Sequence, residues 1–324
     1  MNPQLAVMAT IRGGVFTRAD ARACGYPDPD IDSLLDTGGW RRIRPGTYAA
    51  HRALTLVTAE VLHLRKVYRV LRSGGPAVFA SHQSAAALHA LPLWGLDLSR
   101  VHVTAPHGRG GCVGGVHRHI RDPVGPGIQV WNKLRMVSPA RAVVEVAATA
   151  PISPAVALTE AALYGGLVTR RSLKRAAQDH GNERALQVMA RACTESASVA
   201  ESRLRFMLAE AGLPSPSPSS APDPDLPESV GPDTGILWFP EERTVLEFEP
   251  RYPFWCDDFA PDEIDPTVPA APVDPSAPSP VEHCWISWSD LDHPSRVVDR
   301  IRSTFARASR RTGVRHFDLA RARM

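Results

Sequence analysis

The stretch that decides the fold at the start of the chain is GVFTRADARACGYPDPDIDSLLDTGGWRRIRPGTYAA, residues 14–50. Thr17 stands three residues before Asp20, a spacing that predicts a helix opened by a variant of the capping box. A first helix is expected before this stretch, over residues 2–11, because the glycines that follow would stop it. The chain therefore opens with two short helices.

A third helix is predicted for residues 29–37, with Asp28 as its N-cap and glycines at its end. In residues 40–50, the sequence pattern has a period of two on both sides of an Arg-Pro-Gly-Thr turn. This pattern predicts a two-stranded hairpin. Three helices followed by a hairpin indicate a winged helix-turn-helix domain, which we assign to residues 1–52.

The composition excludes several classes of protein. The chain has 324 residues, of which 44% are apolar and 22% charged, values typical of a globular protein. No apolar run is long enough to span a membrane, and charged residues interrupt the region where a signal peptide would lie, so a cytoplasmic protein is expected. The cysteines are widely spaced, which favours reduced thiols over disulfides or a zinc ribbon.

The net charge of +3 conceals an uneven distribution. Residues 201–300 contain 20 acidic and 6 basic residues, whereas the rest of the chain contains 31 basic and 14 acidic ones. A basic body of this kind predicts double-stranded DNA as a partner. The alternative is a basic surface that is simply solvated.

Residues 53–192 are predicted to form an α+β middle domain. Helices are expected over residues 54–71, 81–91, 136–150, 154–168 and 170–180. Residues 100–106 and 115–120 alternate with period two on either side of a glycine-rich segment, GRGGCVGG, and are predicted to pair as a hairpin.

Residues 193–324 are predicted to form a third domain. A helix at residues 198–211 precedes strands at 235–239, 243–249 and 283–291, and a helix at 294–308 closes the chain. Two inserts, 214–231 and 257–280, are rich in Pro, Ser and Asp and are expected to be loops or disordered. The overall prediction is a multidomain α+β protein.

These segments together resemble a known family. GVFTRADARACGY and GWRRIRPGTYAA resemble the winged-helix domain of AbiEi-type antitoxins, and SHQSAAALHALPLWG, VHVTAP and MVSPARAVVEVA resemble the domain that follows it there. ESRLRFMLAEAGLP, GILWFPEERTVLEFE and ISWSDLDHPSRVVDRIR resemble the very-short-patch-repair-like nuclease domain of the PD-(D/E)XK fold. The resemblance implies a restriction-endonuclease-like α/β domain at the C-terminus, and a regulator that represses its operon and opposes a nucleotidyltransferase toxin.

The nuclease resemblance also implies a magnesium site built from acidic residues. Its candidate catalytic residues are Glu201, Asp233, Glu247 and Glu249, with Asp233 and Glu247 as the metal ligands. Gly235 occupies the position where the family has aspartate, and Asp233 lies two residues earlier, roughly 7 Å along a strand. The acidic insert also replaces a basic helix of the family. Both departures favour a nuclease-like tail without activity, so no cofactor is expected, and Mg²⁺ only if the nuclease is active.

The winged helix has few cations where DNA would be read. Its third helix contains four aspartates and no Arg or Lys, and each carboxylate near a phosphate is a like charge at close range. The DNA-binding candidates are therefore arginines of the second helix and the wing: Arg18, Arg22, Arg41, Arg42 and Arg44. A winged helix that has become a protein-interaction module is the alternative.

Two histidines near the glycine-rich segment have the spacing of possible metal ligands. His117 and His119 share one face of a predicted strand, with Cys112 nearby. A third ligand from a carboxylate is missing there, and such pairs are typical of a surface, so no metal site is predicted.

Three functional hypotheses follow. The first is a DNA-binding transcriptional regulator of the AbiEi antitoxin type with an inactive nuclease-like tail. The second is a magnesium-dependent DNA endonuclease that uses the four acidic residues above. The third is a toxin-neutralising interaction protein, whose acidic tail mimics nucleic acid or covers the protein's own basic face.

Overall fold

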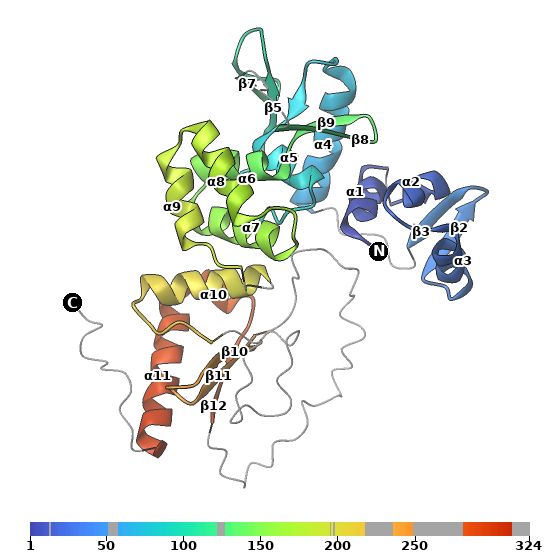
Figure 1. The fold of residues 1–324 in the computed structure, drawn as a ribbon. Coiled ribbons are helices and arrows are strands. Elements are labelled where there is room, and N and C mark those ends of the chain that lie inside the picture. Colours follow the sequence, from blue (N-terminus) through green and yellow to red (C-terminus); the bar gives the residue numbers. More distant parts are fainter. Residues whose placement is uncertain are drawn as a thin grey trace. The chain divides into compact units, whose positions relative to one another are not determined.

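The computed structural model describes residues 1–12, 14–50, 58–121, 127–194, 196, 198–217, 236–248 and 281–312. The described residues fold into two compact units that meet in the sequence between Cys193 and Thr194 (Figure 1). The predicted insert at 257–280, and the predicted insert at 214–231 beyond residue 217, lie outside the described residues.

The first fifty residues form a winged-helix-like arrangement, which confirms the predicted order of three helices and a hairpin. Its elements are α1 (Pro3–Ile11), β1 (Phe16–Thr17), α2 (Arg18–Ala23), α3 (Asp28–Asp36), β2 (Trp40–Arg44) and β3 (Thr47–Ala50). The three strands form an antiparallel sheet in the order β1-β3-β2. β2 and β3 are the wing.

Side-chain caps fix where these helices begin. The Asn2 side chain accepts a hydrogen bond from the Leu5 N–H at 3.0 Å and opens α1. Thr17 and Asp20 form the predicted capping box of α2. The prediction of Asp28 as the N-cap of α3 was wrong, because Pro27 is the extended residue before the helix and Asp28 is already its first residue. The Asp28 carboxylate instead accepts hydrogen bonds from Arg18 and Arg22 of α2.

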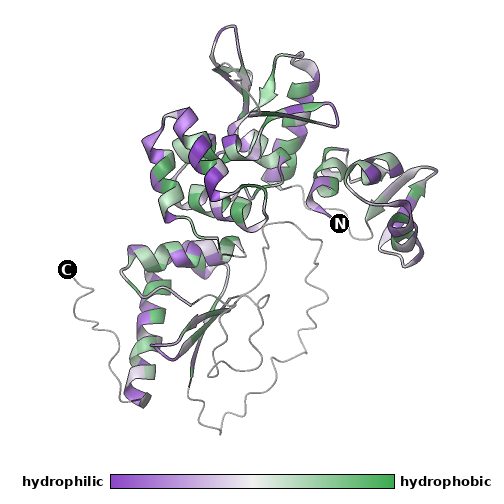
Figure 2. Ribbon diagram, viewed as in Figure 1, coloured by the Kyte–Doolittle hydropathy of each residue, from purple (hydrophilic) through white to green (hydrophobic). Residues whose placement is uncertain are grey.

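An aromatic core holds the winged helix together. Phe16 is fully buried, and its ring meets that of Trp40 edge-on with 4.8 Å between the centroids. Tyr26 also packs edge-on against Trp40, with 5.0 Å between the ring centroids. Such edge-on pairs add about 0.5–1.5 kcal/mol each beyond the burial of their area. Figure 2 shows that hydrophilic and hydrophobic residues are mixed along these elements.

The rest of the first unit is an α+β body. Its strands are β4 (Phe79–Ala80), β5 (Val101–Ala105), β6 (Gly111–Val113), β7 (Val116–Ile120), β8 (Ile128–Trp131) and β9 (Leu134–Val137). Its helices are α4 (Ala59–Ser73), α5 (His82–Leu88), α6 (Pro139–Thr149), α7 (Ile152–Tyr164), α8 (Arg170–His180) and α9 (Glu183–Arg191). The strands form one six-stranded sheet in the order β6-β7-β5-β4-β9-β8.

The predicted hairpin between residues 100–106 and 115–120 was wrong. β5 and β7 are neighbours, but they run parallel, with His102 beside His117 and Thr104 beside His119. The connecting segment contains a strand of its own, β6, which returns antiparallel to β7. Gly114 and Gly115 form the tight turn between them with φ of +57° and +77°, a conformation that favours glycine. The hairpin is thus β6–β7.

α6 is the central helix of the helical layer, since it packs against α5, α7, α8 and α9. Val143, Val144 and Ala147 on α6 are fully buried. α5 in turn packs against β5, so that it lies between the sheet and α6 (Figure 1). The first residue of α5, His82, is thereby held over β5.

The second unit consists of one small sheet and its helices. Its elements are α10 (Val199–Glu210), β10 (Ile236–Phe239), β11 (Thr244–Phe248), β12 (Glu282–Ile286), the 3₁₀ helix η2 (Asp290–Asp292) and α11 (Pro294–Thr312). β10 pairs antiparallel and β12 pairs parallel with the central strand β11. Within the described residues, the two predicted helices and the first two predicted strands are confirmed. The strand predicted over residues 283–291 was wrong beyond Ile286, because the Asp290 carboxylate accepts the Ser287 N–H and the chain turns there into η2.

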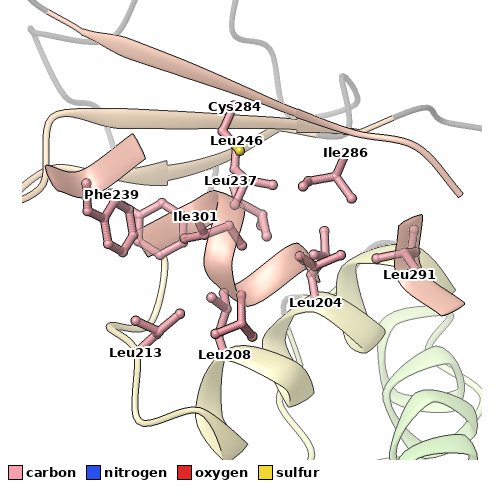
Figure 3. Packing of buried hydrophobic residues seen from close by; sticks show 14 residues of the cluster. Leu204, Leu208, Leu213, Leu237, Phe239, Leu246, Cys284, Ile286, Leu291 and Ile301 are labelled. Carbon is pink, nitrogen blue, oxygen red and sulfur yellow. The ribbon is translucent and has the colours of Figure 1, made fainter. Parts of the chain in front are cut away.

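The core of this unit lies between the sheet and its two helices. Leu237, Leu246 and Ile286 point from the three strands toward Leu204 of α10 and Ile301 of α11 (Figure 3). All five are fully buried. Each contributes about 1.5–3 kcal/mol of transfer free energy relative to an exposed side chain.

Among the described residues, no helix has both the length and the apolar character needed to cross a bilayer.

Candidate nucleic-acid interface

The helix that a winged-helix protein normally places in the major groove is acidic here. α3 carries Asp28, Asp30, Asp32 and Asp36, and the last three are exposed. The face of α3 that points away from the core therefore presents carboxylates. A phosphate brought to this face meets like charges.

The aspartates of α3 engage the arginines of α2. Arg18 donates from Nη1 to the Asp28 Oδ1 at 2.8 Å and also bonds to Asp32. Arg22 donates from Nε to the same Asp28 oxygen at 2.9 Å. The hydrogen bond from Arg22 holds the pKa of Asp28 below its usual value, and the bond to Asp32 raises the pKa of Arg18. These groups stay ionised and compensate each other's charge.

Arg12 is compensated in the same way. It forms an ion pair with Asp20, whose carboxylate is buried and also accepts the Thr17 N–H at 2.8 Å. Three of the six arginines in the first fifty residues are thus paired within the domain. The cationic charge that remains is on the wing.

The wing arginines lie on β2. Arg41 and Arg42 are exposed, and no carboxylate among the described residues forms an ion pair with either. Successive residues of a strand point to opposite faces, so the two guanidinium groups do not lie side by side. The Arg42 guanidinium carbon lies over the Tyr48 ring, 6.0 Å from its centroid.

Arg44, the other predicted wing residue, ends β2. Its backbone pairs with Thr47 across a register shift between Arg42 and Arg44. Its side chain lies outside what the structure describes. The role predicted for Arg44 therefore stays a prediction.

Two of the four predicted nuclease carboxylates lie in the described part of the second unit. Glu201 is buried in the first turn of α10 and accepts from Arg205 Nε at 3.2 Å. Glu247 lies on β11 and shares a 2.6 Å hydrogen bond with the Nδ1 of His283. Asp233 and Glu249 fall outside the described residues.

The described residues include only part of the predicted magnesium site. Each of the two described carboxylates already has a cationic or imidazole partner that competes with a metal ion. No group of three or more metal-binding side chains converges in the described part of the second unit. We therefore derive no catalytic step through Mg²⁺.

Histidines of the first unit come together in a way that the sequence did not predict. His117 and His119 lie on β7, and their neighbours are His102 on β5 and His82 at the start of α5. The signal was present in the sequence, because VHV and VHRH place histidines at alternate positions of two strands. The missing information was that these strands are neighbours and that α5 covers them.

Comparison with known proteins gives a similar family and similar solved structures. No curated protein matches the chain. The chain is similar to a solved structure, the crystal structure of the RV2827C protein from Mycobacterium tuberculosis, with 16% identity and a TM-score of 0.26 over 59% of this chain and 81% of that one. Residues 8–51, which contain the winged helix described above, match the family of AbiEi antitoxin transcriptional regulators.

Proposed function

We propose that this chain is a DNA-binding transcriptional regulator of the AbiEi antitoxin type, and that its winged helix holds duplex DNA through the wing. The family match of residues 8–51 supports the regulator class. The observation that carries the wing assignment is the distribution of ion pairs: Arg18 and Arg22 are neutralised by α3, whereas Arg41 and Arg42 are exposed.

Wing-dominated binding has a defined physical character. Arginines on a wing contact phosphates, which fix the position of a protein on DNA but carry no sequence information. Sequence preference must then come from the shape of the duplex or from a few base contacts. We therefore expect strong dependence on salt and a modest preference for the operator.

The proposal includes a C-terminal domain related to PD-(D/E)XK nucleases that no longer cuts DNA. The order of a helix, two antiparallel strands, a parallel strand and a closing helix is in keeping with that fold. Two further observations support the loss of activity. Glu201 and Glu247 are engaged by Arg205 and His283, and Gly235 stands where the family has aspartate.

A second candidate function is toxin neutralisation by protein contact. It is favoured by the exposed carboxylates Asp30 and Asp36, which suit a basic protein surface better than DNA. The partner would be a cognate nucleotidyltransferase toxin. The two functions are compatible, because α3 and the wing are separate elements of one domain.

A gel shift of the full chain tests the proposal. The probes are the DNA upstream of its own gene and a random duplex of equal length, each with and without Mg²⁺. A shift that prefers the upstream DNA and leaves it intact supports the regulator. Absence of any shift at low salt removes DNA binding and leaves the protein-contact function, whereas cleavage shows an active nuclease.

A further inference from the structure

Three histidines from three different elements converge in the first unit. His82 begins α5, His102 lies on β5 and His119 lies on β7. One ring nitrogen of each histidine lies within 4.8 Å of one ring nitrogen of each of the other two. The Nδ1 of His102 is 3.0 Å from the Nε2 of His119, and the His82 ring stacks on that of His119 at 4.0 Å.

The backbone at His82 is in an unusual conformation. Its φ is +50°, in the left-handed region that residues with a Cβ seldom adopt. Glu145, which is buried on α6, accepts the His82 N–H at 3.0 Å and holds this conformation. Strain of this kind persists where the surrounding structure enforces it, and it is concentrated at ligand sites. Here it directs the His82 ring toward the other two.

Two of the rings are oriented by contacts on the side away from the cluster. The Nδ1 of His82 lies 3.2 Å from the Ser81 Oγ and 3.5 Å from a Glu145 oxygen. The Gln83 amide donates to the Nε2 of His102 at 3.0 Å. Metal-binding histidines are commonly held in this way by a partner on the other ring nitrogen.

Each of the three histidines offers one ring nitrogen to the same point. A neutral imidazole has the free electron pair that a metal ion requires.

We propose that His82, His102 and His119 bind one divalent transition-metal ion of the zinc class, with a coordination position left open to water. Imidazole suits zinc and its neighbours and does not suit magnesium or calcium. Three protein ligands with an open fourth position are typical of reactive zinc sites.

Binding requires small rearrangements. Ligand atoms on a tetrahedral zinc lie about 3.3 Å apart, as follows from bonds of about 2.0–2.1 Å, so the rings must move by about an ångström. His102 must also bind through Nδ1 with its proton on Nε2. A half-turn of the Gln83 amide presents its oxygen to accept that proton and gives up the bond to the Asp97 carbonyl.

The test is zinc titration of the full chain, free of any histidine tag and kept reduced, in competition with a chromogenic chelator. Wild-type protein is expected to bind one equivalent per chain. Substitution His102→Ala or His119→Ala is expected to weaken binding by at least about tenfold. Zinc should raise the melting temperature of the wild type more than that of these variants at the same zinc concentration.

Two control variants test the assignment. His107→Ala removes an exposed histidine of the same region that is not part of the cluster, and Cys112→Ser removes an exposed thiol near it. Both are expected to bind zinc as the wild type does. Circular dichroism checks the fold of each variant, and His119→Gln replaces any alanine variant that fails to fold.

Three outcomes would overturn the proposal. The first is wild-type protein that does not compete with the chelator for zinc. The second is a folded His119 variant, alanine or glutamine, that binds zinc as tightly as the wild type. The third is loss of binding in Cys112→Ser, which would move the metal to the thiol. Cobalt gives an independent readout, because a tetrahedral site produces intense visible absorption that an octahedral aqueous ion does not.

Discussion

The Nη1 of Arg18 lies 2.8 Å from the Oδ1 of Asp28, so a cation of α2 is paired with the first residue of the helix that would enter the DNA groove. Arg22 bonds to the same carboxylate. This arrangement locks α2 to α3 and leaves both arginines electrically compensated. It also separates the winged helix into a compensated helical face and a cationic wing.

Removing those carboxylates should release the arginines. In the variant Asp28→Asn/Asp32→Asn, we expect severalfold tighter binding to random duplex. The slope of log K against log salt concentration should become steeper by about one to two, since each phosphate contact contributes about 0.9 to it. Fluorescence anisotropy over a salt series measures both. Asp30→Asn/Asp36→Asn is the matched control, because it removes two negative charges from α3 without freeing any described ion pair. An equal gain in this control would show that only net charge matters.

The aromatic core should control both folding and DNA binding. Phe16→Ala removes a fully buried ring that packs on Trp40, and we expect it to lower the free energy of unfolding of the winged helix by about 3–5 kcal/mol. Binding to DNA should be lost with the fold. Ile43→Ala, at a wing residue that is 46% exposed, should change the urea midpoint little. Equal midpoints for the two variants would contradict this core.

Stability should fall in mild acid because of buried neutral histidines. His63 is fully buried, its ring lies 3.1 Å from the Leu98 carbonyl and 3.0 Å from the Ser84 hydroxyl, and burial lowers its pKa from 6.5. Burial lowers the pKa of His89 as well. Below about pH 6.5 the unfolded chain binds protons that the folded chain does not, so unfolding becomes easier as the pH falls.

The slope of this effect is at most about 1.4 kcal/mol per pH unit for each histidine. Urea unfolding at pH 7.5, 6.0 and 5.0 measures it. The variant His63→Gln, which has no titrating ring, should show a smaller loss between pH 7.5 and 5.0. A loss as large as that of the wild type would exclude His63 as its source.

The C-terminal unit should leave DNA uncut. Supercoiled plasmid incubated with the full chain and Mg²⁺ or Mn²⁺ is expected to remain supercoiled, because Glu201 and Glu247 already have partners. Nicking that disappears in Glu247→Ala would show that the nuclease is active. Nicking that persists in that variant would point to a contaminant.

Local features of the fold could be predicted from the sequence. The Thr17–Asp20 capping box and the hairpin of the wing depend on residues a few positions apart, so their signals lie within a short stretch. Asp28 was misassigned as a cap because its true partners, Arg18 and Arg22, reach it from another helix. The same ion pairs compensate the charge of Arg18 and Arg22, which the sequence analysis had assigned to DNA binding.

Longer-range features needed the structure. The alternation of residues 100–106 and 115–120 predicted strands correctly, but their parallel pairing depends on the intervening strand β6. The meeting of His82 with His102 and His119 depends in addition on α5 packing over β5. The spacing of residues in the sequence predicts neither the pairing of β5 with β7 nor the packing of α5 over β5. The sequence analysis therefore identified the pair His117 and His119 but missed that His82 and His102 lie beside it.

The most direct test of wing-dominated binding compares three double variants by anisotropy on the upstream duplex and on a random duplex over a salt series. Arg41→Ala/Arg42→Ala should weaken binding to upstream and random DNA alike and reduce the salt slope by about 1.8, or 0.9 per lost phosphate contact. Arg171→Ala/Arg175→Ala, which removes two exposed arginines of α8, controls for net charge, and Arg18→Ala/Arg22→Ala tests the paired arginines. The account predicts a clear loss in the wing variant alone. Wild-type affinity and slope in the wing variant, with the loss in Arg18→Ala/Arg22→Ala instead, would contradict it.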